Sequence, residues 1–276
     1  MKRAVASAQT WWVRLFVLAV VVSTVVAVPR AFELGLIAAL FALSLVRPPR
    51  ADRSPTDLAP PVRGRWAVLN SPGTAVPSHG VKAYGQMYAV DILRPSPDAA
   101  TSIGWSPRTR RPGSYPSFGE PVRAMAVGTV VRATHWQRDH RSRDTWPALL
   151  WMMTVEAFAR ELGGASFILG NHVIVEHDDG TFAAYAHLRR GSARVRAGDR
   201  VTAGQQLGEV GNTGNTSEPH LHVQLMDRSR VTAAAGLPMR WPELTAGEEK
   251  DPRWATGEPK PTALPGFPEN GQIVQA

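Results

Sequence analysis

Two histidines flank a single leucine in GNTGNTSEPHLHVQL, the stretch that covers residues 211–225. In a β-strand, side chains two positions apart point to the same face, so His220 and His222 would face one space. Imidazoles in that arrangement can hold a metal ion, transfer protons, or line a polar strand face. The other residues of the chain that could do chemistry decide among these three.

Two more histidines and an aspartate lie in or beside short apolar runs. His187 is in YAHL, Asp91 is in MYAVDIL, and His79 precedes that aspartate by twelve positions. A carboxylate inside an apolar run is costly to bury unless it is paired or bound to a metal. A catalytic zinc site takes three nitrogen or oxygen ligands and leaves a position for water. One histidine, the aspartate and one member of the H-x-H pair would supply that set, with two imidazoles left for proton transfer.

Composition narrows the chemistry further. The chain has no cysteine, which excludes disulfides, thiolate nucleophiles and cysteine-ligated zinc. It also lacks an H-E-x-x-H sequence, so a base at this site would have to be histidine. The net charge is +8, and four of the 31 basic residues are lysine, which leaves 27 arginines. These arginines are scattered, so the charge indicates no single anionic partner.

Residues 1–46 are interpreted as a membrane segment. Two uncharged apolar runs, 15–28 and 34–46, are separated by a turn containing Pro29 and Arg30. A bilayer-spanning helix needs roughly 17–25 residues, so each run is slightly short. We expect either two short spans forming a hairpin, or one span with the other run lying in the interface. A cleaved signal peptide is less consistent, because a second apolar run follows the first and no small-x-small cleavage site lies between them.

The rest of the chain indicates a mainly β domain. Residues 47–64 are rich in proline and charge, which is typical of a linker. From 65 to 241, short alternating or β-branched runs separated by glycine turns predict an antiparallel sheet. An insertion at about 135–170 breaks this pattern with one helix, which we expect to be buried; a membrane-surface helix or the wall of a substrate groove are the alternatives. Residues 242–276 are again proline-rich, and we expect an extended tail, partly packed through Trp254.

Several of these pieces together resemble a known family. YAHL, followed by VRAGDRVTAGQQLGEVGNTGNTSEPHLHVQL, is similar to the lysostaphin/LytM-type zinc endopeptidases, which cut peptidoglycan peptides. FGEPVRAMAVGTVV resembles the strand-turn-strand that precedes those elements, and the resemblance covers roughly residues 66–240. It implies an antiparallel half-barrel, the duplicated hybrid motif fold, with one zinc ion. Carried over position by position, it implies three zinc ligands and two catalytic histidines: His79, Asp91 and His222 as ligands, and His187 and His220 as the catalytic pair.

The chain departs from the family pattern in two places. In the commonest pattern the first histidine ligand and the aspartate are four residues apart, whereas here they are twelve apart, so GVKAYGQMYAV must loop out and return. The insertion at 135–170 is the second departure. Four histidines have no counterpart in the family motif and are interpreted as surface or structural residues: His135, His140, His172 and His177.

The function implied by the resemblance is zinc-dependent hydrolysis of peptide bonds in bacterial peptidoglycan, in the stem peptide or the cross-bridge. The alternative is an inactive wall-binding or activator module of the same fold, which should lack one or more of the five residues; all five are present. A biotinyl or lipoyl carrier would need a lysine at a hairpin tip, and no lysine is so placed. A nucleic-acid partner is not expected, because the chain lacks a basic stripe and an aromatic platform motif.

Two arguments about the side of the membrane on which the domain lies lead to opposite conclusions. Lys2 and Arg3 lie at one end of the expected hairpin and Arg47 at the other, whereas the turn has Arg30 alone. Because positively charged residues are more frequent on the cytoplasmic side of a membrane, this distribution favours both ends in the cytoplasm. A wall hydrolase in the cytoplasm would have no substrate. Because the charge rule is a bias and access to substrate is a requirement, we expect the domain after residue 60 on the extracytoplasmic, cell-wall side.

Overall fold

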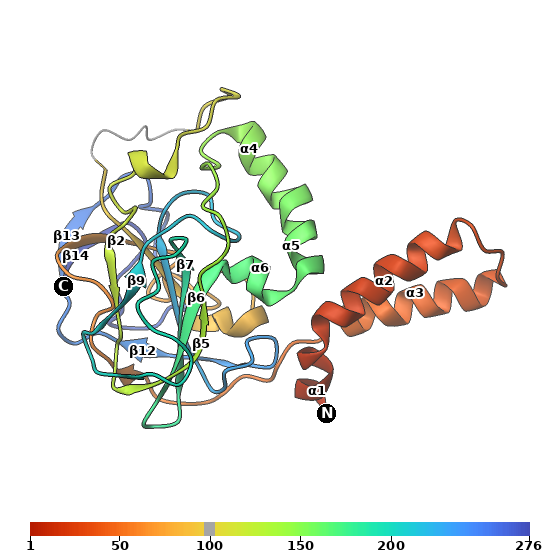
Figure 1. The fold of residues 1–276 in the computed structure, drawn as a ribbon, viewed down its shortest axis with the longest axis horizontal. Helices are drawn as coiled ribbons and strands as arrows, with labels where there is room; N and C mark the ends of the chain where they lie inside the picture. The colour runs from red at the N-terminus through yellow and green to blue at the C-terminus, as the bar shows by residue number, and fades with distance from the viewer. Residues whose placement is uncertain (97–102) are drawn as a thin grey trace.

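A computed structural model describes residues 1–96 and 103–276. In this part of the chain the main feature is an antiparallel sheet of ten strands, in the order β13-β14-β2-β3-β10-β7-β6-β5-β8 with β11 beside β10 (Figure 1). The prediction of a mainly β, antiparallel domain is therefore confirmed. The strands are β2 (Arg65–Leu69), β3 (Val90–Leu93), β5 (Gly128–Thr134), β6 (Asn171–His177), β7 (Phe182–Leu188), β8 (Arg200–Val201), β10 (Leu221–Met226), β11 (Gly236–Leu237), β13 (Thr245–Lys250) and β14 (Gln272–Gln275).

The main hydrophobic core lies on one face of the central strands. Val90 and Ile92 of β3 and Leu221 and Val223 of β10 belong to it, together with Tyr185 of β7. Because side chains alternate along a strand, the residues between these positions point to the opposite face. Two pairs of short strands complete the β-structure: β4 (Pro121–Arg123) with β9 (Gln206–Glu209), and β1 (Thr56–Asp57) with β12 (Met239–Arg240).

Both proline-rich segments pack against the domain more closely than predicted. In the expected linker, 47–64, β1 pairs with β12, and Leu58 and Val62 are buried in the main core. The expected tail, 242–276, contributes β13 and β14 to the main sheet, and Ile273 and Val274 are buried. The prediction of an extended tail is wrong, because a strand of only four residues at its end completes the sheet beside β2. Trp254 does pack in part, against a small cluster that includes Ile273.

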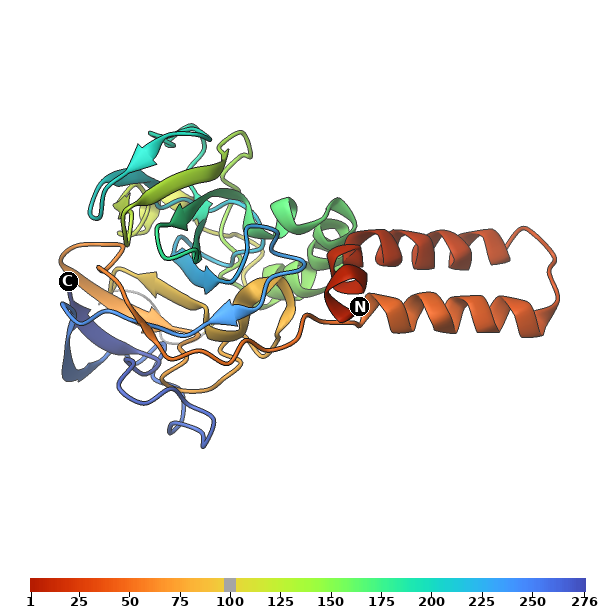
Figure 2. The ribbon, with the colours of Figure 1, turned by 90° about the horizontal axis from the view of Figure 1, so that it is seen from below.

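The N-terminal region is helical. A short helix α1 (Lys2–Ser7) precedes α2 (Gln9–Ser23) and α3 (Arg30–Ser44), and the last two form a hairpin that projects from the domain (Figure 2). The predicted hairpin is therefore present. Within the described residues, no helix combines the length and apolar character needed to cross a membrane, so the expected spans are not confirmed.

The insertion carries one nearly continuous helix from Trp146 to Gly163. It consists of α4 (Trp146–Trp151), a π-helical segment η3 (Met152–Glu156) and α5 (Ala157–Gly163), and the short helix α6 (Ala165–Leu169) follows. None of residues 146–163, all of which the structure describes, is buried, so the prediction of a buried helix is wrong.

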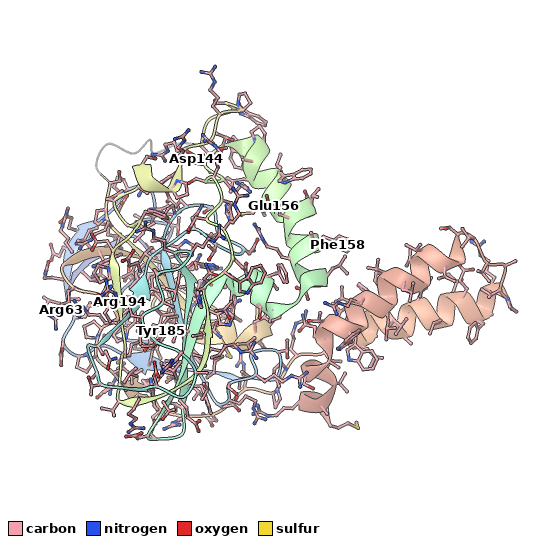
Figure 3. The ribbon with its side chains drawn as sticks, in the orientation of Figure 1. Arg63, Asp144, Glu156, Phe158, Tyr185 and Arg194 are labelled. Atoms are coloured by element: carbon pink, nitrogen blue, oxygen red, sulfur yellow. The ribbon has the colours of Figure 1, made fainter. Side chains whose placement is uncertain are left out.

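The physical reason is that charged side chains, which form ion pairs, occupy the side of this helix that faces the domain. Glu156 lies 2.5 Å from Arg143 and 3.2 Å from Arg160. Figure 3 shows the labelled Glu156 on the side of the domain and Phe158 on the outer side. Most of the large apolar side chains of the helix therefore remain exposed.

We expect Trp151→Ser to change the free energy of unfolding by less than about 1 kcal/mol, because the side chain is 53% exposed. Leu225→Ala, at a core position with 0% exposure, should cost about 2–5 kcal/mol. Denaturant unfolding of both variants measures the difference. Comparable costs would mean that the helix is part of the core.

Strand β6 contains a buried histidine with a structural role. His172 is 1% exposed, and its Nδ1–H donates to the carbonyl oxygen of Gly170 at 2.8 Å. Burial lowers the pKa of this imidazole from 6.5 to about 4. His177, also buried on β6, has its pKa lowered mainly by burial as well. Both fit the prediction of a structural role.

The folded state should therefore lose stability in acid. Because the folded pKa of His172 lies below the unfolded value, its contribution is fully present above pH 6.5 and is lost as the pH falls toward 4. The loss should reach roughly 3 kcal/mol. His172→Asn keeps a side-chain donor and cannot titrate, so the difference in unfolding free energy between it and the wild type should change over this window. Parallel curves for the two proteins would contradict this account.

Candidate metal centre and active site

The candidate centre is built where β3 and β10 pair. In their antiparallel register, Asp91 lies directly opposite His222. Since the neighbours of both residues point into the core, these two side chains share the other face of the sheet. Residues in register on one face have Cβ atoms about 4.5–5.5 Å apart. Sheet pairing alone therefore brings together two residues that are far apart in the sequence.

Three donor groups converge there. Nδ1 of His222 lies 2.8 Å from Oδ1 of Asp91, and Nε2 of His79 lies 3.1 Å from Oδ2 of the same carboxylate. One ligand atom from each residue can be chosen so that all lie within 4.8 Å of one another. Two nitrogens and one oxygen, buried or half-buried, are a donor set suited to zinc, which leaves room for a water. The three residues predicted as ligands are thus side by side, and their role stays a prediction.

His79 reaches the site although twelve positions separate it from Asp91. The excursion 80–89 is closed at its base by Ser78, whose N–H donates to Met87 O at 3.1 Å and whose hydroxyl donates to Ala89 O at 2.6 Å. The segment includes the short helix η1 (Ala83–Tyr88). The chain therefore loops out and returns, as the spacing required.

Hydrogen bonds from outside the set select which nitrogen of each ligand is free. The amide of Gln224 donates to Tyr84 O at 2.7 Å, so its oxygen faces Nε2 of His222 at 2.9 Å and accepts that proton. Ser78 uses its own proton on Ala89 O and can accept Nδ1–H of His79 at 3.2 Å. The lone pairs of His222 Nδ1 and His79 Nε2 are then directed to the centre, as metal binding requires.

The second histidine pair lies beside the three donors. The ring centroids of His187 and His220 are 4.9 Å apart, and His187 is 5.7 Å from His222. Nδ1–H of His187 donates to Thr213 O and Nδ1–H of His220 to Glu218 O, both at 2.8 Å. Each ring therefore keeps a lone pair on Nε2, and that of His220 lies 3.7 Å from Asp91 Oδ1. This leaves two imidazoles able to accept protons next to the candidate metal position.

Backbone geometry sets His187 apart from the rest of its strand. Its φ is 61°, in the left-handed region that non-glycine residues rarely adopt. Holding a side chain in this conformation costs about 1–3 kcal/mol and occurs most often at functional sites. The bond to Thr213 O and the burial of the ring, which is 5% exposed, keep it there.

Electrostatics favour an ionised Asp91 and disfavour the charged form of His187 and His79. Burial raises the pKa of Asp91, but nearby His79 and His220 and the hydrogen bonds outweigh it and hold the pKa well below its usual value. Burial, reinforced by the other histidines, holds the pKa of His187 well below 6.5, and burial also lowers that of His79. For His222, burial acts downward, yet the bond and charge of Asp91 raise the pKa overall. A cation bound between these two residues would displace that shared proton.

The insertion supports the loop that precedes the H-x-H pair. Asp139 Oδ1 accepts from Asn212 N–H at 2.7 Å, and Arg160 donates to Asn215 Oδ1 at 3.0 Å. Gly214 has a φ of 79°, and a Cβ there would lie 2.4 Å from Gly170 N, so glycine is required. The inserted segment thus holds the loop whose carbonyl groups orient His187 and His220.

Several residues of the site were not predicted. Gln224 orients His222, and Asn70, itself at a φ of 42°, donates to Asp91 Oδ2 at 2.7 Å. Gln224 could have been found, because it is two positions after His222 and so shares its strand face. Asn70 gave no such signal, because only the pairing of β2 with β3 brings it to Asp91.

A hydrogen-bond chain joins this site to the N-terminal helices. Beyond Gln224, the phenol of Tyr84 donates to Glu161 Oε1 at 2.5 Å and accepts from Gln9 Nε2 at 3.0 Å. Gln9 also donates to Glu161 at 2.8 Å. The first residue of α2 and a residue of α5 therefore both contact the excursion that carries Tyr84.

Part of the chain is similar in sequence to known proteins. Residues 153–233 match the model of Peptidase family M23, a range that contains His187, His220 and His222. Peptidoglycan DD-endopeptidase ShyA of Vibrio cholerae is 39% identical over 72 residues, which are 25% of this chain and 16% of that protein. Glycyl-glycine endopeptidase ALE-1 of Staphylococcus capitis is 39% identical over 126 residues, 45% of this chain and 26% of that protein.

A solved structure is also similar to part of the chain. The catalytic domain of lysostaphin from Staphylococcus simulans is 22% identical, with a TM-score of 0.33, and the match covers 59% of this chain and 84% of that chain. The segments shared with ShyA and ALE-1 are well under two thirds of those proteins. The match of residues 153–233 to Peptidase family M23 and the similarity to these two relatives confirm the predicted resemblance to the lysostaphin/LytM-type peptidases.

Proposed function

We propose that this protein is a zinc-dependent endopeptidase that hydrolyses peptide bonds of bacterial peptidoglycan, in the stem peptide or the cross-bridge. The observation that carries the proposal is the convergence of His79, Asp91 and His222 beside two imidazoles whose Nε2 atoms are free. The names of the relatives, which act on peptidoglycan or on glycyl-glycine bonds, support the substrate class.

The donor set fits zinc, and the ion would be held by His79, Asp91 and His222. When bound it would polarise a peptide carbonyl and lower the pKa of a water. His187 and His220 perform the proton transfers: one accepts the proton of the attacking water at Nε2, and the other stabilises the oxyanion or donates to the leaving amine. The carbonyl groups of Thr213 and Glu218 keep both rings oriented throughout.

We further propose that the domain lies on the extracytoplasmic side, attached to the membrane by residues 1–46. The support is substrate access, because peptidoglycan lies outside the cytoplasmic membrane. An inactive wall-binding module remains the alternative function. Assay of released peptides separates the two, since a binding module would retain affinity for the wall and release no fragments.

The first test removes the site residues one at a time. His222→Ala should lose zinc, because only two protein ligands would remain. His187→Ala and His220→Ala should retain zinc and lose about 10²–10⁴-fold in turnover. Elemental analysis gives the metal content, and mass spectrometry of fragments released from purified walls gives the activity. Full zinc in His222→Ala would show that the ligand assignment is wrong.

The second test concerns the residue that orients a ligand. Gln224→Leu removes the acceptor for Nε2–H of His222, and we expect zinc affinity to fall by about 10–100-fold. Competition with a chelator measures the affinity without any peptidase assay. Gln275→Leu, an exposed position on β14, is the matched control and should bind zinc as the wild type does. Equal affinities for the two variants would rule out an orienting role for Gln224.

A further inference from the structure

The helix from Trp146 to Gly163 is apolar on the side that faces away from the domain. Its outward large side chains are 42–68% exposed: Trp146, Leu150, Trp151, Met153, Val155 and Phe158. Among the exposed positions of this helix Thr154 alone is polar, and its hydroxyl is bonded to Leu150 O at 2.6 Å. A surface helix of a soluble protein normally has the opposite arrangement, with its apolar side on the core.

The hairpin of α2 and α3 has the same character. Residues 15–29 and 34–46 contain no charge, and large side chains such as Leu18 and Phe41 are 57% and 50% exposed. Charges are confined to its two ends. At the end next to the domain, Arg14 lies 4.9 Å from the ring of Trp11, which is 60% exposed. An apolar middle bounded by tryptophan and arginine is typical of a segment surrounded by lipid.

Hydrogen bonds join these two apolar elements directly. Arg14 Nε donates to Leu162 O at 2.8 Å, and Gln9 donates to Glu161 at 2.8 Å. Figures 1 and 2 show that α4 and α5 run crosswise at the base of the hairpin, on the side from which it projects. A bilayer that received the hairpin would therefore also meet the outer side of the inserted helix.

We propose that helix 146–163 is a membrane-surface helix, whose outer side enters the interfacial layer of the same phospholipid bilayer that receives the hairpin. Amphipathic helices in this layer bury their apolar side by about 5–10 Å. Two contacts through elements that run in different directions hold the domain at one orientation, whereas a hairpin alone leaves it free to tilt. The metal centre then stays at a constant height above the lipid.

A bilayer fits this surface better than a second copy of the chain. The hairpin projects well beyond the helix on the same side (Figure 2), so a second copy approaching that side would meet the hairpin first. A fluid lipid phase surrounds both shapes without this obstacle.

The absence of cysteine makes a direct test possible. Val155→Cys on the outer side of the helix and Val127→Cys before β5 replace valines that are 47% and 41% exposed. Each full-length protein is labelled with a nitroxide and reconstituted in vesicles of phosphatidylethanolamine and phosphatidylglycerol. Collision rates with oxygen, which dissolves in lipid, and with a water-soluble nickel complex then report the surroundings of the label.

The label at position 155 should be several-fold less accessible to nickel than the label at 127, and more accessible to oxygen. Adding Trp151→Ser and Phe158→Ser should restore nickel access at 155 while the hairpin still retains the protein on the vesicles. Equal nickel access at the two positions, or no binding to vesicles, would overturn the proposal. Shielding from both reagents with dipolar broadening between labels would overturn it in favour of a second copy. None of these readouts depends on peptidase activity.

Discussion

The register between β3 and β10 is the constraint on which the rest of the structure depends. It places Asp91 opposite His222 on one face and, by alternation, Val90, Ile92 and Val223 in the core on the other. If one of the two strands slipped by one residue, the polar side chain of that strand would turn into the core and its apolar neighbours would turn out of it. Forming the core and assembling the candidate centre are therefore the same event. The hydrophobic free energy that stabilises the sheet also offsets the cost of removing the Asp91 carboxylate from water.

Around this pairing, the fold determines where protons reside. His187 and His220 each donate Nδ1–H to a carbonyl of the loop before β10, and His222 donates Nε2–H to Gln224. Every ring thus has its free lone pair directed inward. The inserted segment, a departure from the family pattern, holds that loop through Asp139 and Arg160. The insertion therefore contributes to the site as well as presenting an apolar helix to the outside.

The predictions that failed have a common physical cause. The inserted helix is apolar nearly all round, so its periodicity could not show which side faces the domain. Its orientation follows from the pairing of Glu156 with Arg143 before the helix and from the hydrogen bond of Arg160 to Asn215, and the second of these exists only in the tertiary structure. The C-terminal segment is rich in proline and charge, and its short strand, β14, joins the main sheet because the edge of β2 is available to pair with it. Composition describes a segment by itself. The orientation of the helix and the formation of β14 depend instead on the residues that contact these segments in the folded protein.

The amino-acid sequence by itself determined the β-class, the inserted helix, and the residue types of the site. Alternation and side-chain chemistry are local properties that indicated a metal or proton-transfer site, and the resemblance to a family assigned its roles to His187, His220, His222 and Asp91. Only the tertiary structure decided that the excursion after His79 closes back onto Asp91, which nitrogen of each histidine is free, and that the helix is apolar outward. Each of these is set by contacts between residues distant in the chain, and such contacts exist only once the sheet has formed.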